Sequence, residues 1–384
     1  MGERLITNGR VWDAGPVVAT EVLLAGGRIR EVGTGLSHSH PGVIDAGGDW
    51  LLPGFIDLHT HGGGGVDINH ADVAALGTLG RFFATQGVTG YLPTIVTDTL
   101  EQTLDCLAVL AAAQSQPVPG PRILGAHLEG PYLAPEYAGA APRDLLRPPA
   151  IADLALYHDA FRGGRLHLTV AAELPGMPDF IAAARTLGMS VALGHTGATY
   201  ETTRACIAAG ATIATHTFNG MKLPHQHAPA ATGAILESDL YCEAICDGRH
   251  LHPGMVRLLL KCQGPDRVIA VTDSIAAAGL PDGEYFLGVN TIQVKDGDAW
   301  LKDGTSRAGS TLTMAAALRN LAAWTNRPFP EVAPLLTRNP AAALGLGDRK
   351  GRLAVGFDAD LVQLDLTGAV RRTIVGGDQI WERP

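Results

Sequence analysis

The stretch "GFIDLHTH", residues 54–61, places two histidines two positions apart at the end of an apolar run. Side chains at positions i and i+2 of a β-strand point to the same face, so His59 and His61 are expected to project together. The four glycines that follow, residues 62–65, leave space beside them and let the backbone turn sharply. The pattern is typical of a metal site at the open end of a strand, although two histidines that meet in a solvated loop would also produce it.

Seven further apolar runs of strand length follow, and alanine-rich helical segments such as residues 71–87 and 202–210 alternate with them. Eight strands are the number that closes a (β/α)8 barrel, and strands buried on both faces read as continuous apolar runs. We therefore predict an α/β fold whose main part is a (β/α)8 TIM-like barrel. The seven runs are "GVTGYLPTIVT" (87–97), "RILGAHLEG" (122–130), "LHLTVAAE" (166–173), "MSVALGHTG" (189–197), "ATIATHTFNG" (211–220), "YCEAICDGRH" (241–250) and "RVIAVTDS" (267–274).

Polar side chains gather at the carboxyl ends of these runs. Glu129 ends the third run, His195 lies in the fifth, His216 in the sixth, and Asp273 near the end of the eighth. The carboxyl ends of barrel strands meet at one face, where active sites of this fold are built. Together with the two histidines of the first run, these residues predict a metal site rather than six unrelated polar caps.

The two ends of the chain have a different pattern. Short alternating strands joined by glycine-containing turns are predicted within residues 4–33 and again within 351–384. We expect both ends to form one small β-sandwich domain into which the barrel is inserted. The predicted parts are the N-terminal part of the β domain (1–52), the barrel (53–343) and the C-terminal part of the β domain (344–384).

Composition restricts the class of protein. The 384 residues are 46% hydrophobic and 17% charged, which allows a sizeable core, and a net charge of −9 without a Lys/Arg cluster argues against a nucleic-acid surface. The charged N-terminus is unlike a signal peptide, and no apolar run is long enough to span a membrane. Five cysteines without a CxxC pair fit reduced thiols in a cytoplasmic protein. Cys242 and Cys246 alternate with apolar residues, which favours buried strand packing over metal binding.

Several motifs, taken in order along nearly the whole chain, resemble those of the N-acetylglucosamine-6-phosphate deacetylases of the amidohydrolase superfamily. "HLEGP" (127–131) in particular separates that family from the many amidohydrolases that use a carboxylated lysine. Glu173 stands where such a lysine would be expected, and a structural hydrogen bond is its preferred interpretation. The motifs are "PGFIDLHTHGGGG" (53–65), "GAHLEGPYLAP" (125–135), "GHTGAT" (194–199), "THTFNGM" (215–221), "VTDSIAAAG" (271–279), "AGSTLTM" (308–314) and "NPAAALGL" (339–346).

The resemblance implies metal-dependent hydrolysis of the acetamide of N-acetyl-D-glucosamine 6-phosphate to D-glucosamine 6-phosphate and acetate. It also implies that Glu129, His195 and His216 hold the principal divalent metal. Because both histidines of the HxH pair are present, a second ion beside them and Glu129 is expected as well. Imidazole and carboxylate ligands suit zinc or ferrous iron, one or two ions per subunit. Asp273 is the expected general base, and a homodimer is the expected assembly.

Substrate contacts are also implied by the resemblance, with three departures from the usual pattern. Relatives commonly have a histidine where this chain has Ala141, a phosphate-binding arginine where it has His227, and an apolar residue where it has Arg307. We hypothesise that Arg307 takes over much of the missing positive charge, with His227 and His250 completing the phosphate site. The implied substrate-binding residues are Ala140, Asn219, Gly220, His227, His250 and Arg307.

The departures keep two alternatives open for the substrate, namely N-acetylgalactosamine 6-phosphate and an unphosphorylated N-acetyl amino sugar. A third alternative, from another class, is a non-catalytic barrel used for assembly. That alternative predicts an eroded set of ligands, whereas all six metal and base candidates are present in this chain.

Overall fold

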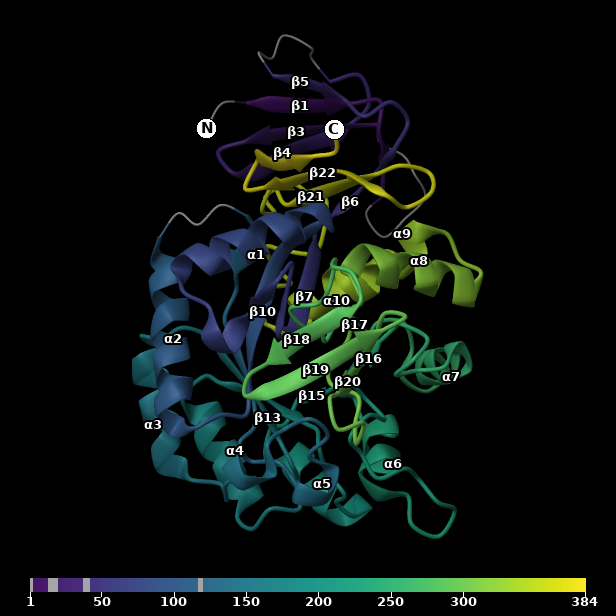
Figure 1. Ribbon diagram of the computed structural model, residues 1–384. Coiled ribbons are helices and arrows are strands. Elements are labelled where there is room, and N and C mark those ends of the chain that lie inside the picture. Colours follow the sequence, from purple (N-terminus) through teal and green to yellow (C-terminus); the bar gives the residue numbers. More distant parts are fainter. Residues whose placement is uncertain (1–2, 13–19, 37–41, 117–119) are drawn as a thin grey trace.

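The computed structural model describes residues 3–12, 20–36, 42–116 and 120–384, and within these ranges a parallel barrel forms the centre of the molecule (Figure 1). Each of the eight predicted runs contains one of its strands, so the predicted barrel is confirmed. Neighbouring strands pair in chain order. They are β7 (Phe55–Thr60), β10 (Val88–Val96), β12 (Ala126–Glu129), β13 (Leu166–Val170), β14 (Ser190–Leu193), β15 (Ile213–Ala214), β16 (Tyr241–Ile245) and β17 (Val268–Val271).

The first and last strands close the barrel. The amide of Asp273 donates to the carbonyl of His59 at 2.8 Å, and the amide of His61 donates to the carbonyl of Ser274 at 2.7 Å. The hydroxyl oxygens of Thr60 and Ser274 lie 2.8 Å apart beside these bonds. The carboxyl ends of β7 and β17 are therefore held together at one rim.

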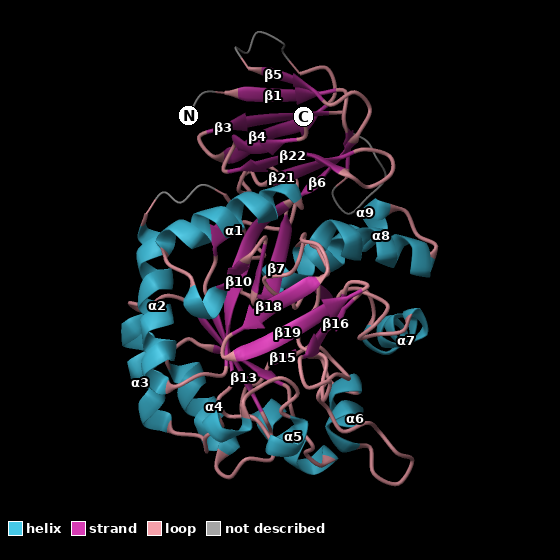
Figure 2. Ribbon diagram, in the orientation of Figure 1, coloured by secondary structure: helices cyan, strands magenta, loops and turns pink. Residues whose placement is uncertain are grey.

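Helices lie outside the strands (Figure 2). Several begin at a side-chain cap, as α1 does where the Asp72 carboxylate accepts the amide of Ala75 at 2.7 Å. The helices are α1 (Val73–Thr85), α2 (Leu100–Ser115), α3 (Ile151–Ala160), α4 (Met177–Thr186), α5 (Tyr200–Ala208), α6 (Ala230–Leu236), α7 (Pro253–Gln263), α8 (Met314–Thr325), α9 (Phe329–Val332) and α10 (Arg338–Ala343), with single 3-10 turns η1 (Ile68–His70), η2 (Pro135–Tyr137), η3 (Arg143–Leu145) and η4 (Ala333–Leu336).

The two chain ends form two sheets beside the barrel, seen at the top of Figure 1. β21 pairs antiparallel with β6, which joins the C-terminal strands to an N-terminal one. A common apolar cluster that includes Ile6, Leu24 and Leu361 packs between the sheets. One sheet contains β4 (Arg28–Gly33), β3 (Glu21–Ala25), β1 (Arg4–Thr7) and β5 (Val43–Asp45); the other contains β2 (Arg10–Val11), β6 (Trp50–Pro53), β21 (Leu361–Leu364), β22 (Val370–Val375) and β23 (Asp378–Glu382).

The small sandwich is thus observed where it was predicted, although residues 13–15 of the first predicted strand pair lie outside the described residues. We propose the limits 1–52, 53–343 and 344–384 as its boundaries with the barrel.

A feature that the sequence analysis did not predict follows β17: β18 (Gly283–Leu287), β19 (Asn290–Lys295) and β20 (Asp298–Leu301) form an antiparallel sheet. Figure 1 shows β18 and β19 crossing in front of the barrel strands.

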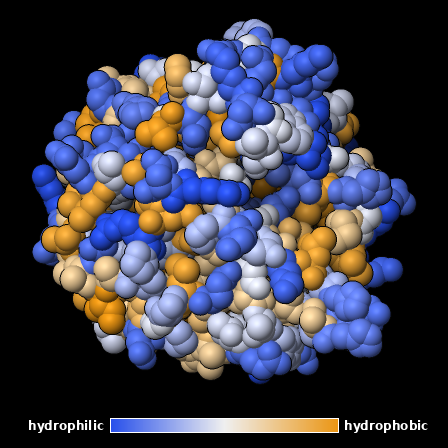
Figure 3. Space-filling view, turned by 60° about the horizontal axis from the view of Figure 1, so that its bottom comes forward, coloured by the Kyte–Doolittle hydropathy of each residue, from blue (hydrophilic) through white to orange (hydrophobic). Residues whose placement is uncertain are grey.

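The surface agrees with the composition. In the view of Figure 3, hydrophilic side chains cover most of the face and hydrophobic ones gather only in small groups. No helix in the described ranges is both long and apolar enough to cross a bilayer. Cys242 and Cys246 are buried at β16, as predicted.

Candidate metal centre

The end of β7 brings the two histidines of the opening stretch to the inside of the rim: His59 lies in the strand, and His61 directly follows its last residue, Thr60. Every residue of β7 is buried, and the ring Nε2 atoms of His59 and His61 lie 3.3 Å apart. This is the arrangement that the i, i+2 spacing predicts.

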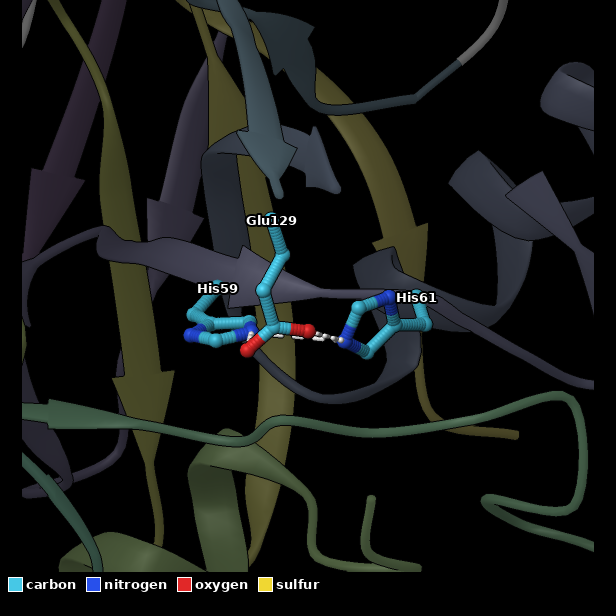
Figure 4. A group of neighbouring side chains, drawn as sticks. All are labelled: His59, His61 and Glu129. Atoms are coloured by element: carbon cyan, nitrogen blue, oxygen red, sulfur yellow. Dashed lines mark hydrogen bonds and ion pairs between the residues drawn. The ribbon is translucent and has the colours of Figure 1, made fainter. Parts of the chain in front are cut away.

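The carboxylate of Glu129, at the end of β12, reaches the space between these two rings (Figure 4). Its Oε1 lies 3.4 Å from Nε2 of His59, and its Oε2 lies 3.2 Å from Nε2 of His61. All three side chains are buried. This first group has a donor set that could hold a metal ion.

A second group around the same carboxylate contains His195 and His216. Glu129 Oε1 lies 3.1 Å from His195 Nε2 and 3.0 Å from His216 Nε2. The two groups share Glu129, so the site could hold one ion in either group or two ions bridged by the carboxylate.

The chemistry of this donor set fits a divalent cation. His195 and His216 bring their Nε2 atoms within 3.0 Å of each other, and two lone pairs facing at this distance repel unless a proton or a metal lies between them. Burial lowers the pKa of His61, but hydrogen bonds to Asp273 and Glu129 outweigh it and raise that pKa to about 9. The buried carboxylates therefore stabilise positive charge at this position, which a metal ion also supplies.

Hydrogen bonds at the far side of two rings fix their orientation. The Nδ1 atom of His195 lies 2.7 Å from the carbonyl of Tyr137, which cannot donate, so this nitrogen carries the proton and Nε2 has a free lone pair. The buried Glu243 lies with Oε2 3.2 Å from Nδ1 of His59 and accepts the amide of His216 at 3.1 Å. Sequence analysis missed Glu243, because it lies inside a run interpreted as strand packing.

Backbone conformation also marks the site. His195, His216 and Asp273 have φ values of 48°, 26° and 51°, in the left-handed region that favours glycine. Such residues cost roughly 1–3 kcal/mol each and cluster at functional sites. At these positions all three side chains line the cavity at the rim.

Asp273 lies beside the first group. Its Oδ1 is 3.2 Å from Nε2 of His61 and 3.5 Å from Nε2 of His59. Burial raises the pKa of Asp273, but the nearby imidazolium charges outweigh it and hold this pKa below its ordinary value. The carboxylate is therefore ionised at neutral pH and able to accept a proton.

A cavity of about 300 Å3 opens onto the cluster and brings the other candidates to it. Glu129, Asp273, His61, His195 and His216 line its inner part. His227, in contrast, is exposed on the loop before α6 and does not line the cavity in a single chain. Five of the six predicted substrate-binding residues also line it: Ala140, Asn219, Gly220, His250 and Arg307.

The outer wall of the cavity comes from the sheet that follows β17. Trp300 and Arg307 both line it, and the guanidinium of Arg307 stacks over the Trp300 ring at 4.9 Å from its centroid. Asp298 binds that guanidinium at two points, 2.9 and 3.0 Å. Sequence analysis missed Trp300 and Asp298; an aromatic residue in a polar hairpin close to a family motif was the available signal.

Glu173 has a structural position. It accepts hydrogen bonds from the hydroxyl of Thr196 and, at 2.5 Å, from the amide of Gly197. These bonds hold the loop directly after His195, in agreement with the preferred interpretation. Glu173 is in neither group of candidate metal ligands.

A closed parallel barrel with a buried histidine and carboxylate cluster at its carboxyl rim defines a class of metal-dependent hydrolases. The model of the amidohydrolase family matches residues 50–380, and the chain belongs to this family. Membership implies a divalent metal at the cluster described above.

Two relatives of this chain are amino-sugar-phosphate deacetylases. N-acetylglucosamine-6-phosphate deacetylase of Vibrio furnissii is 33% identical over 378 residues, 98% of this chain and 94% of the relative. N-acetylgalactosamine-6-phosphate deacetylase of Escherichia coli O157:H7 is 35% identical over 324 residues, 84% of this chain and 85% of the relative. Because these relatives are hydrolases, the comparisons support an enzyme over a non-catalytic assembly protein.

The fold is shared with solved structures of such enzymes. One is an aspartate-to-alanine mutant of N-acetyl-D-glucosamine-6-phosphate deacetylase from Mycobacterium smegmatis, in complex with N-acetyl-D-glucosamine 6-phosphate. It matches with a TM-score of 0.92 at 32% identity and covers 99% of this chain and 100% of its own.

Proposed function

We propose that the protein hydrolyses the acetamide of N-acetyl-D-glucosamine 6-phosphate to D-glucosamine 6-phosphate and acetate, a step of amino-sugar catabolism. One observation carries the proposal: a single cavity is lined by four of the five metal-ligand candidates and Asp273 together with His250 and Arg307. A reactive end and a cationic region in one space suit an acetamide and a phosphate on the same sugar.

In this proposal Glu129, His195 and His216 hold the principal ion, and His59 and His61 with Glu129 hold a second one. Zinc and ferrous iron both suit these ligands. When bound, a divalent ion lowers the pKa of a water molecule toward neutrality and polarises the acetyl carbonyl.

Asp273 is the proposed general base. Its ionised carboxylate would accept the proton of the attacking water and return it to the sugar nitrogen as the C–N bond breaks. Ala140, Asn219 and Gly220, which line the cavity beside the cluster, are the proposed contacts to the sugar.

His250 and Arg307 are the proposed phosphate contacts. Burial lowers the pKa of His250, but the hydrogen bond of its Nδ1 to Asp247, 2.7 Å long, outweighs it and raises that pKa. The imidazole therefore keeps a positive charge to higher pH than a free histidine does. Asp298 already neutralises part of the charge of Arg307, so we assign Arg307 a smaller share of the binding energy.

Replacing Arg307 with alanine should lower kcat/KM for the 6-phosphate about tenfold, the lower end of what a charge-assisted hydrogen bond contributes. The measurement compares N-acetylglucosamine with and without its 6-phosphate in both proteins. Arg249→Ala is the control, because Arg249 also faces Asp298, at 3.7 Å, but does not line the cavity. Equal phosphate preference in wild type and Arg307→Ala would exclude Arg307 from the site, and no preference in wild type would favour an unphosphorylated substrate.

Replacing Asp247 with asparagine should make phosphate recognition sensitive to pH. Without the Asp247 carboxylate, burial is the largest remaining cause and, together with the charge of Arg307, lowers the pKa of His250, while Asp273 still raises it. The positive charge of His250 is then lost at a lower pH than in wild type. We expect KM for the phosphorylated sugar to rise more between pH 6 and pH 8 in the variant than in wild type. KM for the unphosphorylated sugar is the control and should not acquire this pH dependence; identical profiles for wild type and variant would contradict the assignment of His250.

A second candidate substrate is N-acetylgalactosamine 6-phosphate. The similarity to the Escherichia coli O157:H7 deacetylase favours it, and Ala141 and His227, which depart from the pattern that the resemblance implies, keep it open. Acetate release from both 6-phosphates and both free sugars, with the metal content of the same preparation, tests the proposal. A higher kcat/KM for the galacto sugar would establish this second candidate, and no release from any of the four would refute the deacetylase.

A homodimer is part of the proposal. His227 lies outside the cavity of its own chain, so it could contact a substrate only from a second subunit. Light scattering tests the mass, and a monomer that keeps full activity would remove His227 from the proposed site. We also propose a cytoplasmic location, which the absence of disulfides among the described cysteines supports.

A further inference from the structure

A second cavity, of about 670 Å3, lies far from the metal cluster along the barrel. Arg122, the first residue of β11 (Arg122–Ile123), and Arg165, directly before β13, line it. These are the amino ends of the strands, whereas Glu129 is the last residue of β12. The cavity therefore belongs to the opposite end of the barrel, where β22 and β23 of the small domain complete its wall.

The wall carries an excess of positive charge. Four cationic side chains line it, whereas Asp378 is its only carboxylate among the described lining residues. The four are Arg122, Arg165, Arg349 and Lys350.

Two of these four have acidic partners. Arg349 contacts Asp358 at 3.1 Å, and Lys350 contacts Asp358 at 2.8 Å and Asp360 at 2.5 Å. Arg28 also contacts Asp358, at 2.8 Å, so three cations share two carboxylates. This group therefore still has one positive charge in excess.

The other two have no acidic partner. Within the described ranges, no carboxylate lies within 4 Å of Arg122 or Arg165. Arg165 donates instead to the carbonyl of Leu124 at 3.2 Å, and Arg122 lies against the backbone of Gly376. Arg165 and Arg349 line the same cavity, and burial together with the charge of Arg349 lowers the pKa of Arg165.

Like charges held close at a cavity wall are stabilised when an anion binds between them. The rest of the wall includes apolar side chains such as Leu76, Ile123 and Ile380, which suit the organic part of a ligand. Guanidinium groups bind phosphate with two parallel hydrogen bonds. We propose that this cavity is a binding site for a phosphate-bearing small molecule, separate from the catalytic cavity.

Calorimetric titration of the metal-loaded protein with inorganic phosphate and with ADP tests the proposal. A double variant, Arg307→Ala with His250→Ala, removes the proposed phosphate contacts of the catalytic cavity and should keep the binding. Arg165→Gln and Arg122→Gln should each weaken it roughly ten- to a hundredfold, the loss expected for a charged hydrogen bond. Arg30→Gln is the matched control, since Arg30 is exposed on β4 and does not line the cavity.

Thermal unfolding of each variant checks that the fold is intact. If Arg165→Gln is unstable, Arg122→Gln alone provides the test, because Arg122 is exposed and its replacement should leave the fold unchanged. Neither arginine touches the catalytic cavity, so both variants should keep wild-type kcat/KM in the absence of added anion. Tighter binding of ADP than of phosphate would indicate that the apolar wall contributes. Absence of binding by both probes, or binding that disappears only in the catalytic double variant, would overturn the proposal.

Discussion

Replacing Asp273 with asparagine is expected to lower kcat by roughly 10²–10⁴-fold, the usual contribution of a general base. Asparagine has nearly the shape of aspartate but cannot accept and return a proton. The metal content should stay near that of wild type, because Asp273 lies outside both groups of candidate ligands. The measurement is acetate release across pH together with metal analysis of the same sample.

Asp72→Asn is the matched control for this change. Asp72 caps α1 and does not line the cavity, and asparagine caps helices as well as aspartate does. Its activity should equal that of wild type. If Asp273→Asn kept near-normal activity across pH, another group would have to be the base.

Alanine at His195 or His216 is expected to abolish activity and to empty the principal metal site. Removing a residue that hydrogen-bonds to a metal ligand already lowers metal affinity about 10–100-fold, and removing the ligand itself should lower it further. Alanine at both His59 and His61 should remove at most the second ion and leave partial activity. Metal stoichiometry and acetate release distinguish the two cases.

His158→Ala provides the control, since His158 lies on α3 and in neither group of ligands. Unchanged metal occupancy after the loss of His195 would refute this set of ligands. If replacing both His59 and His61 lowered activity as much as replacing His195 or His216, both ions would be required.

Local sequence pattern was sufficient to predict the barrel and the rim cluster. Each of the eight strands is a nearly continuous apolar run, and the polar residue that ends a run must lie at the rim when all strands are parallel. The orientation of His59 and His61 is the most directly predictable feature, because side chains two positions apart in an extended segment point to the same face.

Local sequence pattern does not predict contacts between segments that are distant in the chain. Glu243 alternates with apolar neighbours like a packing residue, and only the closed barrel brings it behind His59. The sheet after β17 interrupts the strand–helix alternation, so the pattern of apolar runs does not place Trp300 at the cavity. The position of His227 depends on the shape of an exposed loop, which no periodicity encodes.

The closure of the barrel between β7 and β17 has a consequence for how the enzyme is made. Thr60 and Ser274, whose hydroxyls meet at this seam, are 214 residues apart in the chain. Contacts of such long separation form late, because the entropy of closing the intervening loop must be overcome first. During synthesis on the ribosome, His59 and His61 emerge long before Asp273, so the nascent chain holds two candidate metal ligands without the proposed base. Hydrolytic activity should therefore appear only after the last barrel strand has been released and docked, and a chain ending before β17 should have none.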